Sequence, residues 1–332
     1  MDTYLELSRA ERRLLCESAQ VALGLPAASI EKDFWVCWTL RELFALPEWG
    51  AHLTFKGGTS LSKCWQLIER FSEDIDVVID RAFLGFPDDA FSNKRLLKLK
   101  EACGARIAGD LLPRLAERLG TRLPADGSWR IEAAGPDEDP DLQTLVFHYP
   151  TELAGQRDYV APVVRIELGA RSDTEPAERP SMRPLLADAS DGLDVEPFPV
   201  RAVAPRRTFW EKAMLLHEET WRPAEKARKA RLSRHYYDLW CLITRGVAAE
   251  AVRDTGLFDR VARHRRQFFR YSWLDYDTLA PGRLRLCPLA EQEGRWRQDY
   301  DAMRGAMFFN EPPPFDEILR VVGDFERAFN AA

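Results

Sequence analysis

The stretch Leu53–Asp80 constrains the fold of this chain more than any other part of its sequence. A short apolar run leads into Gly57-Gly58, where the missing β-carbons allow a sharp turn and the close approach of a ligand. We expect a helix to follow, capped by Thr59 or Ser60. Its apolar face would comprise Leu61, Trp65, Leu67 and Ile68. A second, buried strand is predicted by β-branched residues at Ile75, Val77, Val78 and Ile79.

Two aspartates interrupt the apolar character of this second strand. Asp74 and Asp76 are two residues apart, so in a strand both carboxylates project from the same face, towards the glycine turn. Two adjacent anions favour a bound cation, and Mg²⁺ is commonly held by one or two carboxylates together with substrate phosphates. The simpler interpretation is an exposed strand edge. The preceding Gly-Gly-Thr-Ser sequence favours the metal site.

Other phosphate-binding loops do not fit the glycine turn. A P-loop requires G-x-x-x-x-G-K-[ST], whereas counting from Gly57 gives Ser62-Lys63-Cys64. No G-x-G-x-x-G follows a predicted strand, so a Rossmann dinucleotide site has no support.

A third carboxylate lies on another predicted strand, Val163–Arg171. Alternation places Arg165, Glu167 and Gly169 on one face of this strand. Glu167 is therefore a candidate to join the aspartates. The alternative is a structural ion pair of Glu167 with Arg165 or Arg171.

The order of Gly57-Gly58-Thr59-Ser60, a helix and Ser72-Glu73-Asp74-Ile75-Asp76 resembles the signature of the polymerase-β-type nucleotidyltransferase superfamily. More narrowly, the chain resembles the AbiEii-type nucleotidyltransferase toxins of bacterial toxin–antitoxin and abortive-infection systems. Further matching segments are Glu31–Trp35, Arg165–Gly169, Glu211-Lys212 and Tyr237–Trp240. The resemblance implies an α/β (α+β) fold, with a nucleotidyltransferase domain over residues 1–200 and a mainly helical domain with basic surface over residues 201–332.

The same resemblance implies roles for individual residues. Asp74 and Asp76 would hold Mg²⁺ or Mn²⁺, and Glu167 would complete the catalytic carboxylates. The residues implied in binding a nucleoside triphosphate (NTP) are Lys56, Gly57, Gly58, Thr59, Ser60, Lys63, Lys212 and Asp238. For Lys212 and Asp238, an interhelical salt bridge is the structural alternative. For Lys32 and Asp33, the structural alternative to a place beside the active site is an ordinary solvent-facing surface.

Composition indicates a globular protein of 332 residues with 45% apolar residues and a net charge of −6. Any nucleic-acid binding must therefore come from a local basic patch. Residues 201–235 provide one, with ten Lys or Arg against four Glu, a local balance of +6. Six scattered cysteines and the lack of a signal peptide or membrane span predict a cytoplasmic location.

These observations together predict a metal-dependent nucleotidyltransferase. The resemblance implies a toxin that is neutralised by a cognate antitoxin protein and transfers a nucleotide to RNA, at the 3′ end of tRNA. Two alternatives remain open from sequence: nucleotidylation of a protein or small molecule, and a nucleotide-binding interaction module without turnover. Near the N-terminus, residues 3–23 predict one amphipathic helix, with Leu5, Leu14, Leu15, Val21 and Leu23 on or near its apolar face.

Overall fold

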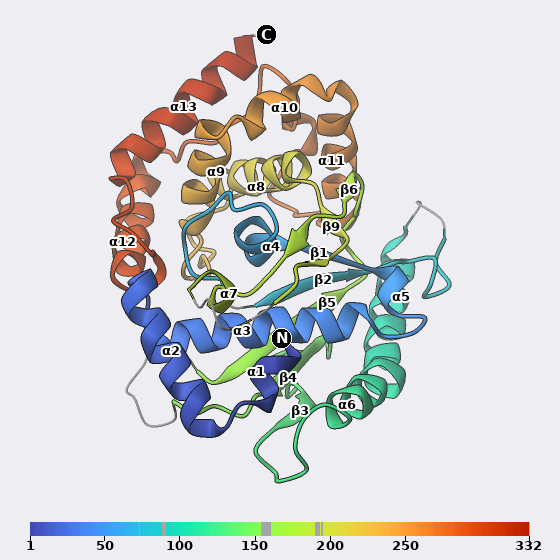
Figure 1. The fold of residues 1–332 in the computed structure, drawn as a ribbon. Helices are drawn as coiled ribbons and strands as arrows, with labels where there is room; N and C mark the ends of the chain where they lie inside the picture. The colour runs from blue at the N-terminus through green and yellow to red at the C-terminus, as the bar shows by residue number, and fades with distance from the viewer. Residues whose placement is uncertain (73, 88–90, 154–160, 190–192, 194, 332) are drawn as a thin grey trace. The chain divides into compact units, whose positions relative to one another are not determined.

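The computed structural model describes residues 1–332 except 73, 88–90, 154–160, 190–192, 194 and 332 (Figure 1). Glu73, part of the motif around the aspartates, thus lies outside the described residues. The chain divides into two compact units. The first comprises Met1–Cys64 and Ser72–Ala202, and the second comprises Trp65–Phe71 and Val203–Ala332.

The first unit combines a mixed sheet with helices, as the α/β (α+β) prediction requires. Its helices are α1 (Asp2–Glu6), α2 (Arg9–Leu23), α3 (Ala27–Phe44), α4 (Gly57–Lys63), α5 (Asn93–Arg106), α6 (Leu112–Gly120) and α7 (Leu186–Ala189), with a 3-10 turn at Gly50–His52 and a π-helical turn at Ile107–Leu111. Its strands are β1 (Leu53–Lys56), β2 (Ile75–Ile79), β3 (Arg130–Ala133), β4 (Thr144–His148), β5 (Val163–Gly169), β6 (Ala177–Glu178), β7 (Ser181–Met182) and β8 (Phe198–Pro199), and β9 (Ala202–Val203) spans the unit boundary.

The main sheet has the order β3-β4-β5-β2-β1-β9-β6. Strand β2 is the centre of this arrangement, because it pairs antiparallel with β1 on one side and parallel with β5 on the other. The predicted strands around Ile75 and Val163 are therefore hydrogen-bonded neighbours. This placement brings Asp76 and Glu167, far apart in the sequence, onto adjacent strands.

One face of the sheet is closed by α3, which runs along it in Figure 1. Trp35 and Trp38 from this helix pack against Phe147 of β4, with ring centroids 6.0 Å apart in both pairs. In register with Phe147 is Val164 of β5, which is fully buried. Burial of these large apolar groups fixes which face of each strand points inward.

The opposite face of β5 is more open. Arg165 and Gly169 are half-buried and Glu167 is exposed, whereas Val164, Ile166 and Leu168 are buried. The predicted alternation of this strand is confirmed.

The helix after the glycine turn differs from its prediction. Helix α4 begins at Gly57 and ends at Lys63, so Thr59 and Ser60 lie inside it and do not cap it. Trp65, which was predicted for its apolar face, lies beyond its end, in the second unit. The prediction failed because apolar spacing continues past the last helical residue.

The N-terminal helix prediction also needs correction. Two helices, α1 and α2, replace one, and Ser8 caps α2 by accepting a hydrogen bond from the Glu11 amide. The expected apolar face is wrong at two of its five residues, because Leu14 and Val21 are 63% and 87% exposed, whereas Leu5, Leu15 and Leu23 are half-buried. Cys16 and Ala19 are the buried residues of α2.

The second unit is mainly helical. It contains α8 (Pro205–Thr220), α9 (Arg234–Thr244), α10 (Val247–Arg253), α11 (Thr255–Phe268), α12 (Ala290–Met307), α13 (Phe315–Ala331) and a 3-10 turn at Tyr276–Thr278. Helix α9 packs against α8, α10 and α13. Among the described residues, no helix combines the length and apolar character needed to cross a membrane.

The segment Trp65–Phe71 joins this unit through its backbone. The Phe71 amide donates to the Met307 carbonyl at 2.6 Å, and the Phe309 amide donates to the Glu69 carbonyl at 3.2 Å. Arg245 also donates to the Gln66 carbonyl at 2.6 Å. These contacts are between residues far apart in sequence, and no local pattern predicts them.

Candidate active site

A row of polar side chains crosses the open face of the first unit's sheet. Backbone register places Lys56 of β1 opposite Asp76 of β2, and Asp76 beside Glu167 of β5. Neighbouring strands are about 4.8 Å apart, so these three side chains leave the sheet as neighbours. Two carboxylates side by side repel each other, which makes this position unfavourable unless a cation or a proton is shared between them.

Asp76 projects against the glycine turn, as the strand alternation predicted. Gly57 has a φ of +82°, a backbone conformation that glycine adopts without a steric penalty. A β-carbon placed on Gly57 would lie only 2.0 Å from the Asp76 Oδ2 atom. Gly57 is therefore required by the close approach of this carboxylate as well as by its backbone angle.

Asp74 lies one residue before β2, and a side chain from α4 holds its backbone. The Thr59 hydroxyl donates to the Asp74 carbonyl at 2.5 Å and lies 2.8 Å from the Ser72 hydroxyl oxygen. Thr59 is buried, with 1% of its surface exposed. Its hydroxyl is thus engaged in positioning the segment that carries Asp74.

The protonation behaviour of Glu167 reflects the neighbouring carboxylates. The pKa of the Glu167 carboxyl is raised, first by loss of hydration and then by the negative charges of Asp76 and Asp74. Arg165 and Lys56 oppose this shift. Arg165 itself donates to Glu138 at 3.1 Å, so its hydrogen bond goes to a different carboxylate.

The carboxylates of Asp74 and Asp76 are suitable ligands for a divalent cation that also binds substrate. In the described part of the chain, no three His, Cys, Asp or Glu side chains are grouped as a complete metal site. Mg²⁺ nevertheless needs only one or two protein carboxylates when phosphates and water supply its other ligands. Asp74 and Asp76 can supply those carboxylates, and a cation there would relieve the repulsion from Glu167.

Two lysines implied in nucleotide binding already have partners. Lys56 donates to the Ser172 hydroxyl at 3.0 Å. Lys63 forms a 2.6 Å ion pair with Asp33, whose other oxygen accepts the Leu185 amide at 2.7 Å. Desolvation alone would lower the pKa of Lys63, but Asp33 outweighs it and the pKa is raised. Lys63 therefore stays charged, and its ammonium is held by Asp33.

Asp33 and Lys32 are both buried, with 9% and 2% of their surfaces exposed. The alternative of an ordinary solvent-facing surface is therefore wrong for these residues. Lys32 donates to the Ala161 carbonyl at 3.1 Å.

Lys212 and Asp238 lie in the second unit and form a salt bridge of 2.6 Å. The Asp238 carboxylate is completely buried and also accepts two hydrogen bonds from Arg70, at 2.7 and 2.8 Å. Burial alone would raise the pKa of Asp238, but Arg70 and Lys212 hold it far below its ordinary value. Sequence reasoning missed Arg70, which belongs to the segment Trp65–Phe71.

Lys212 has a second contact with a titratable group. Its ammonium lies 3.3 Å from the His235 Nδ1 atom. Burial lowers the pKa of Lys212 more than Asp238 raises it. Burial and the nearby cations Lys212 and Arg234 lower the pKa of His235 well below its ordinary value, so this imidazole is neutral and can accept from Lys212.

Comparison with known proteins gives one family. The family model described as "Nucleotidyl transferase AbiEii toxin, Type IV TA system" matches residues 38–321. A search of curated proteins finds no match. Among solved structures, the chain is similar to MenT4, a nucleotidyltransferase toxin from Mycobacterium tuberculosis H37Rv, with 22% identity over 98% of this chain and 99% of that one. The TM-score is 0.45, which is too low to carry an argument about function.

Proposed function

Because this chain belongs to the AbiEii nucleotidyl transferase toxin family of type IV toxin–antitoxin systems, we propose that it transfers a nucleotide from an NTP to the 3′ end of a tRNA and thereby blocks translation. The family match establishes the nucleotidyltransferase class and confirms the resemblance found in the sequence. The acceptor, the metal and the residue roles are our proposal. The observation that carries them is the row formed by Lys56, Asp76 and Glu167.

The reaction joins an acceptor hydroxyl to the α-phosphate of the NTP. The hydroxyl oxygen attacks phosphorus, the bond to the β-phosphate oxygen breaks, and pyrophosphate leaves. Glu167 is suited to receive the hydroxyl proton, because its raised pKa makes it a stronger base than an ordinary carboxylate. Asp74 and Asp76 would hold Mg²⁺ or Mn²⁺, which when bound supplies charge stabilisation at the phosphates.

Groups beside the carboxylates would bind the phosphates. Helix α4 begins at Gly57 without a side-chain cap, which leaves the amides of Gly58 and Thr59 as donors, with Ser60 next to them in the first turn. The amide of Thr59 can take part, but its hydroxyl is engaged with Asp74. Lys56 adds a positive charge on the neighbouring strand.

We assign Lys212 and Asp238 a role in nucleotide binding on the strength of the family pattern. Lys212 would contact the triphosphate as a point charge, and Asp238 would hold Lys212 and Arg70 in place. The salt bridge and this role are compatible, because Arg70 neutralises Asp238 on its own when Lys212 turns to a phosphate.

The remaining parts of the proposal concern partners. The basic stretch 201–235 suits the phosphates of an RNA acceptor. Membership of a toxin–antitoxin family implies a cognate antitoxin protein. We also propose a cytoplasmic location, in keeping with six free cysteines.

The test is a labelling experiment. Purified protein is incubated with each α-labelled NTP, Mg²⁺ and total RNA, and RNA and protein are separated. We expect labelled tRNA with the wild type and no label with Asp74→Asn or Asp76→Asn, because an amide is a poor Mg²⁺ ligand.

Asp80→Asn is the matched control, since Asp80 follows the same strand but is exposed and caps the turn at Ala82. It should label tRNA as the wild type does. Full turnover by Asp74→Asn or Asp76→Asn would refute their role. Labelled protein without labelled RNA would replace the RNA acceptor with a protein.

A further inference from the structure

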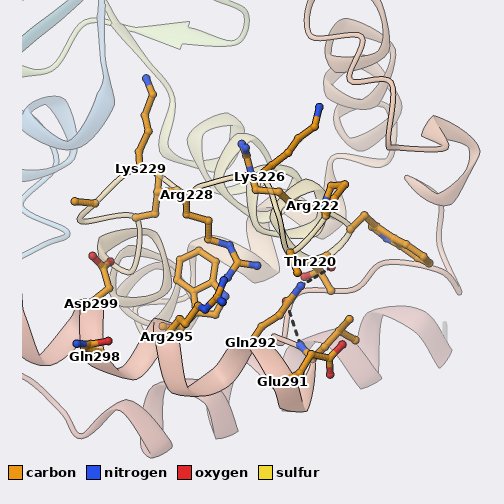
Figure 2. Close-up of a pocket in the computed structure, with 17 residues that line it drawn as sticks. Thr220, Arg222, Lys226, Arg228, Lys229, Glu291, Gln292, Arg295, Gln298 and Asp299 are labelled. Atoms are coloured by element: carbon orange, nitrogen blue, oxygen red, sulfur yellow. Dashed lines mark hydrogen bonds between the residues drawn. The ribbon is translucent and has the colours of Figure 1, made fainter.

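The second unit contains a cavity of about 740 Å³, and four of the cations that line it belong to the basic stretch 201–235. It lies between the loop that follows α8 and the first turns of α12 (Figure 2). Figure 2 shows Lys226, Arg228 and Lys229 on the loop side, and Gln292 and Arg295 on the helix. This volume is within the range of about 300–1,000 Å³ that small-ligand sites occupy.

The cavity is positively charged within an acidic protein. Five Lys or Arg side chains line it, against the two acidic residues Glu291 and Asp299. Asp299 is occupied structurally, since it accepts the backbone amides of Arg231 and Ser233 at 2.6 and 2.9 Å. The lining therefore carries an excess of positive charge.

The cations of the lining fall into two groups. Arg222 and Arg228 share the single carboxylate of Glu219, at 2.7 and 3.3 Å. In the part of the chain that the structure describes, no carboxylate pairs with Lys226, Lys229 or Arg295, and all three are exposed. These three charges are available to an anionic ligand.

Aromatic rings accompany these charges. Trp221 lines the cavity with 38% of its surface exposed, and the Arg285 guanidinium lies 4.7 Å from its ring centroid. Arg228 lies over Trp296 at 4.7 Å, which holds its guanidinium plane in the wall. The Lys226 ammonium lies 4.3 Å from the centroid of the Trp273 ring, so its charge is held beside the cavity without a carboxylate from the described residues. An exposed indole beside cations that no described carboxylate neutralises is the arrangement by which proteins stack an unpaired base and hold its phosphates.

We propose that this cavity binds one unstacked nucleotide of a single-stranded RNA segment, with the base against Trp221 and the adjoining phosphates on Lys226, Lys229 and Arg295. The inference rests on the proposed function only in naming the acceptor RNA as the source of that segment. An acidic peptide would use the same cations but has no planar group for the indole. A free nucleotide shares the base and phosphate chemistry, and the experiment separates the two sources.

The first arm measures the affinity of a fluorescent ten-nucleotide single-stranded RNA at several KCl concentrations. The variant Lys229→Glu/Arg295→Glu should bind more than tenfold more weakly than the wild type. Loss of two phosphate contacts should flatten the slope of log K against log salt by about 1.4. The matched control is Arg253→Glu/Arg283→Glu, which makes the same charge change at exposed positions of the same unit outside the cavity.

The second arm tests stacking. Trp221→Ala should weaken RNA binding by roughly 5- to 150-fold, the equivalent of about 1–3 kcal/mol for one stacked base, whereas Trp221→Phe should retain most of the affinity. Equal melting temperatures of all variants and the wild type show that the fold is intact.

Three results would overturn the proposal. The first is equal RNA affinity for the cavity variant and its matched control. The second is displacement of the RNA by AMP at the same concentration as the oligonucleotide, which assigns the cavity to free nucleotides. The third is equally tight binding of a ten-residue glutamate peptide.

Binding does not require turnover, so the outcome is independent of the labelling experiment. A wild type that binds RNA through these residues but labels only protein would refute the proposed acceptor and leave the cavity assignment standing.

Discussion

Replacement of Gly57 by alanine tests the geometry of the candidate active site most directly. The new β-carbon would lie 2.0 Å from the Asp76 Oδ2 atom and 2.8 Å from its carboxyl carbon. An ordinary contact begins at 3.4 Å, so the carboxylate would have to move by more than 1 Å. A misplacement of about 1 Å in a reacting group typically costs about 100-fold in rate.

The loss of stability expected for Gly57→Ala has two contributions. Alanine at a φ of +82° costs roughly 1–2 kcal/mol, because its β-carbon crowds the backbone. Displacing Asp76 from its preferred rotamer adds about 0.5–1.5 kcal/mol. We therefore expect Gly57→Ala to lose about 1.5–3.5 kcal/mol in the free energy of unfolding.

Gly85 provides the control for the backbone part alone. It has a φ of +86°, and a β-carbon there meets nothing within 4 Å. Gly85→Ala should lose about 1–2 kcal/mol and keep its transferase rate. Chemical denaturation and the labelling experiment measure both quantities. If Gly57→Ala and Gly85→Ala have the same rate, the contact with Asp76 does not matter for the reaction and the reasoning fails.

Three further predictions concern the same residues. Glu167→Gln should abolish transfer yet raise the free energy of unfolding at pH 7. Because the folded-state pKa of Glu167 is raised, the wild type gains stability as the pH falls through that pKa. Denaturation curves should therefore show the stability difference between the variant and the wild type shrinking towards pH 4.5. Thr59→Val should lose about 0.5–1.5 kcal/mol and much of the activity, because it removes the donor to the half-buried Asp74 carbonyl, whereas Thr59→Ser should retain stability and activity. Full activity of Thr59→Val would show that this hydrogen bond does not position Asp74. Asp238→Ala should lose about 3–5 kcal/mol, because it leaves the buried charges of Arg70 and Lys212 without their carboxylate, whereas Lys212→Ala should lose less and bind NTP more weakly. Equal losses on denaturation would contradict this.

The local sequence determined the three strands that carry Lys56, Asp76 and Glu167 and the order of the active-site motif. Alternation in β5 was sufficient to place Glu167 on the open face, because side chains of a strand point in turn to opposite faces. The glycine turn and the aspartates were likewise evident, since two successive glycines after a strand predict a sharp turn and charged residues are unusual in a buried strand. The match of the family model over residues 38–321 confirms the family to which these motifs pointed.

Only the tertiary structure decided which distant residues meet. It paired Lys63 with Asp33, and it brought Arg70 from a segment between two parts of the first unit to the buried Asp238. It also exposed Leu14 and Val21, which periodicity had predicted to be buried. Periodicity reports that a helix has an apolar stripe, but what covers that stripe depends on long-range packing. The partner of a buried charge likewise depends on proximity in the folded structure and not on separation in the sequence. A charge that has lost its hydration must be balanced by an oppositely charged or hydrogen-bonding group beside it.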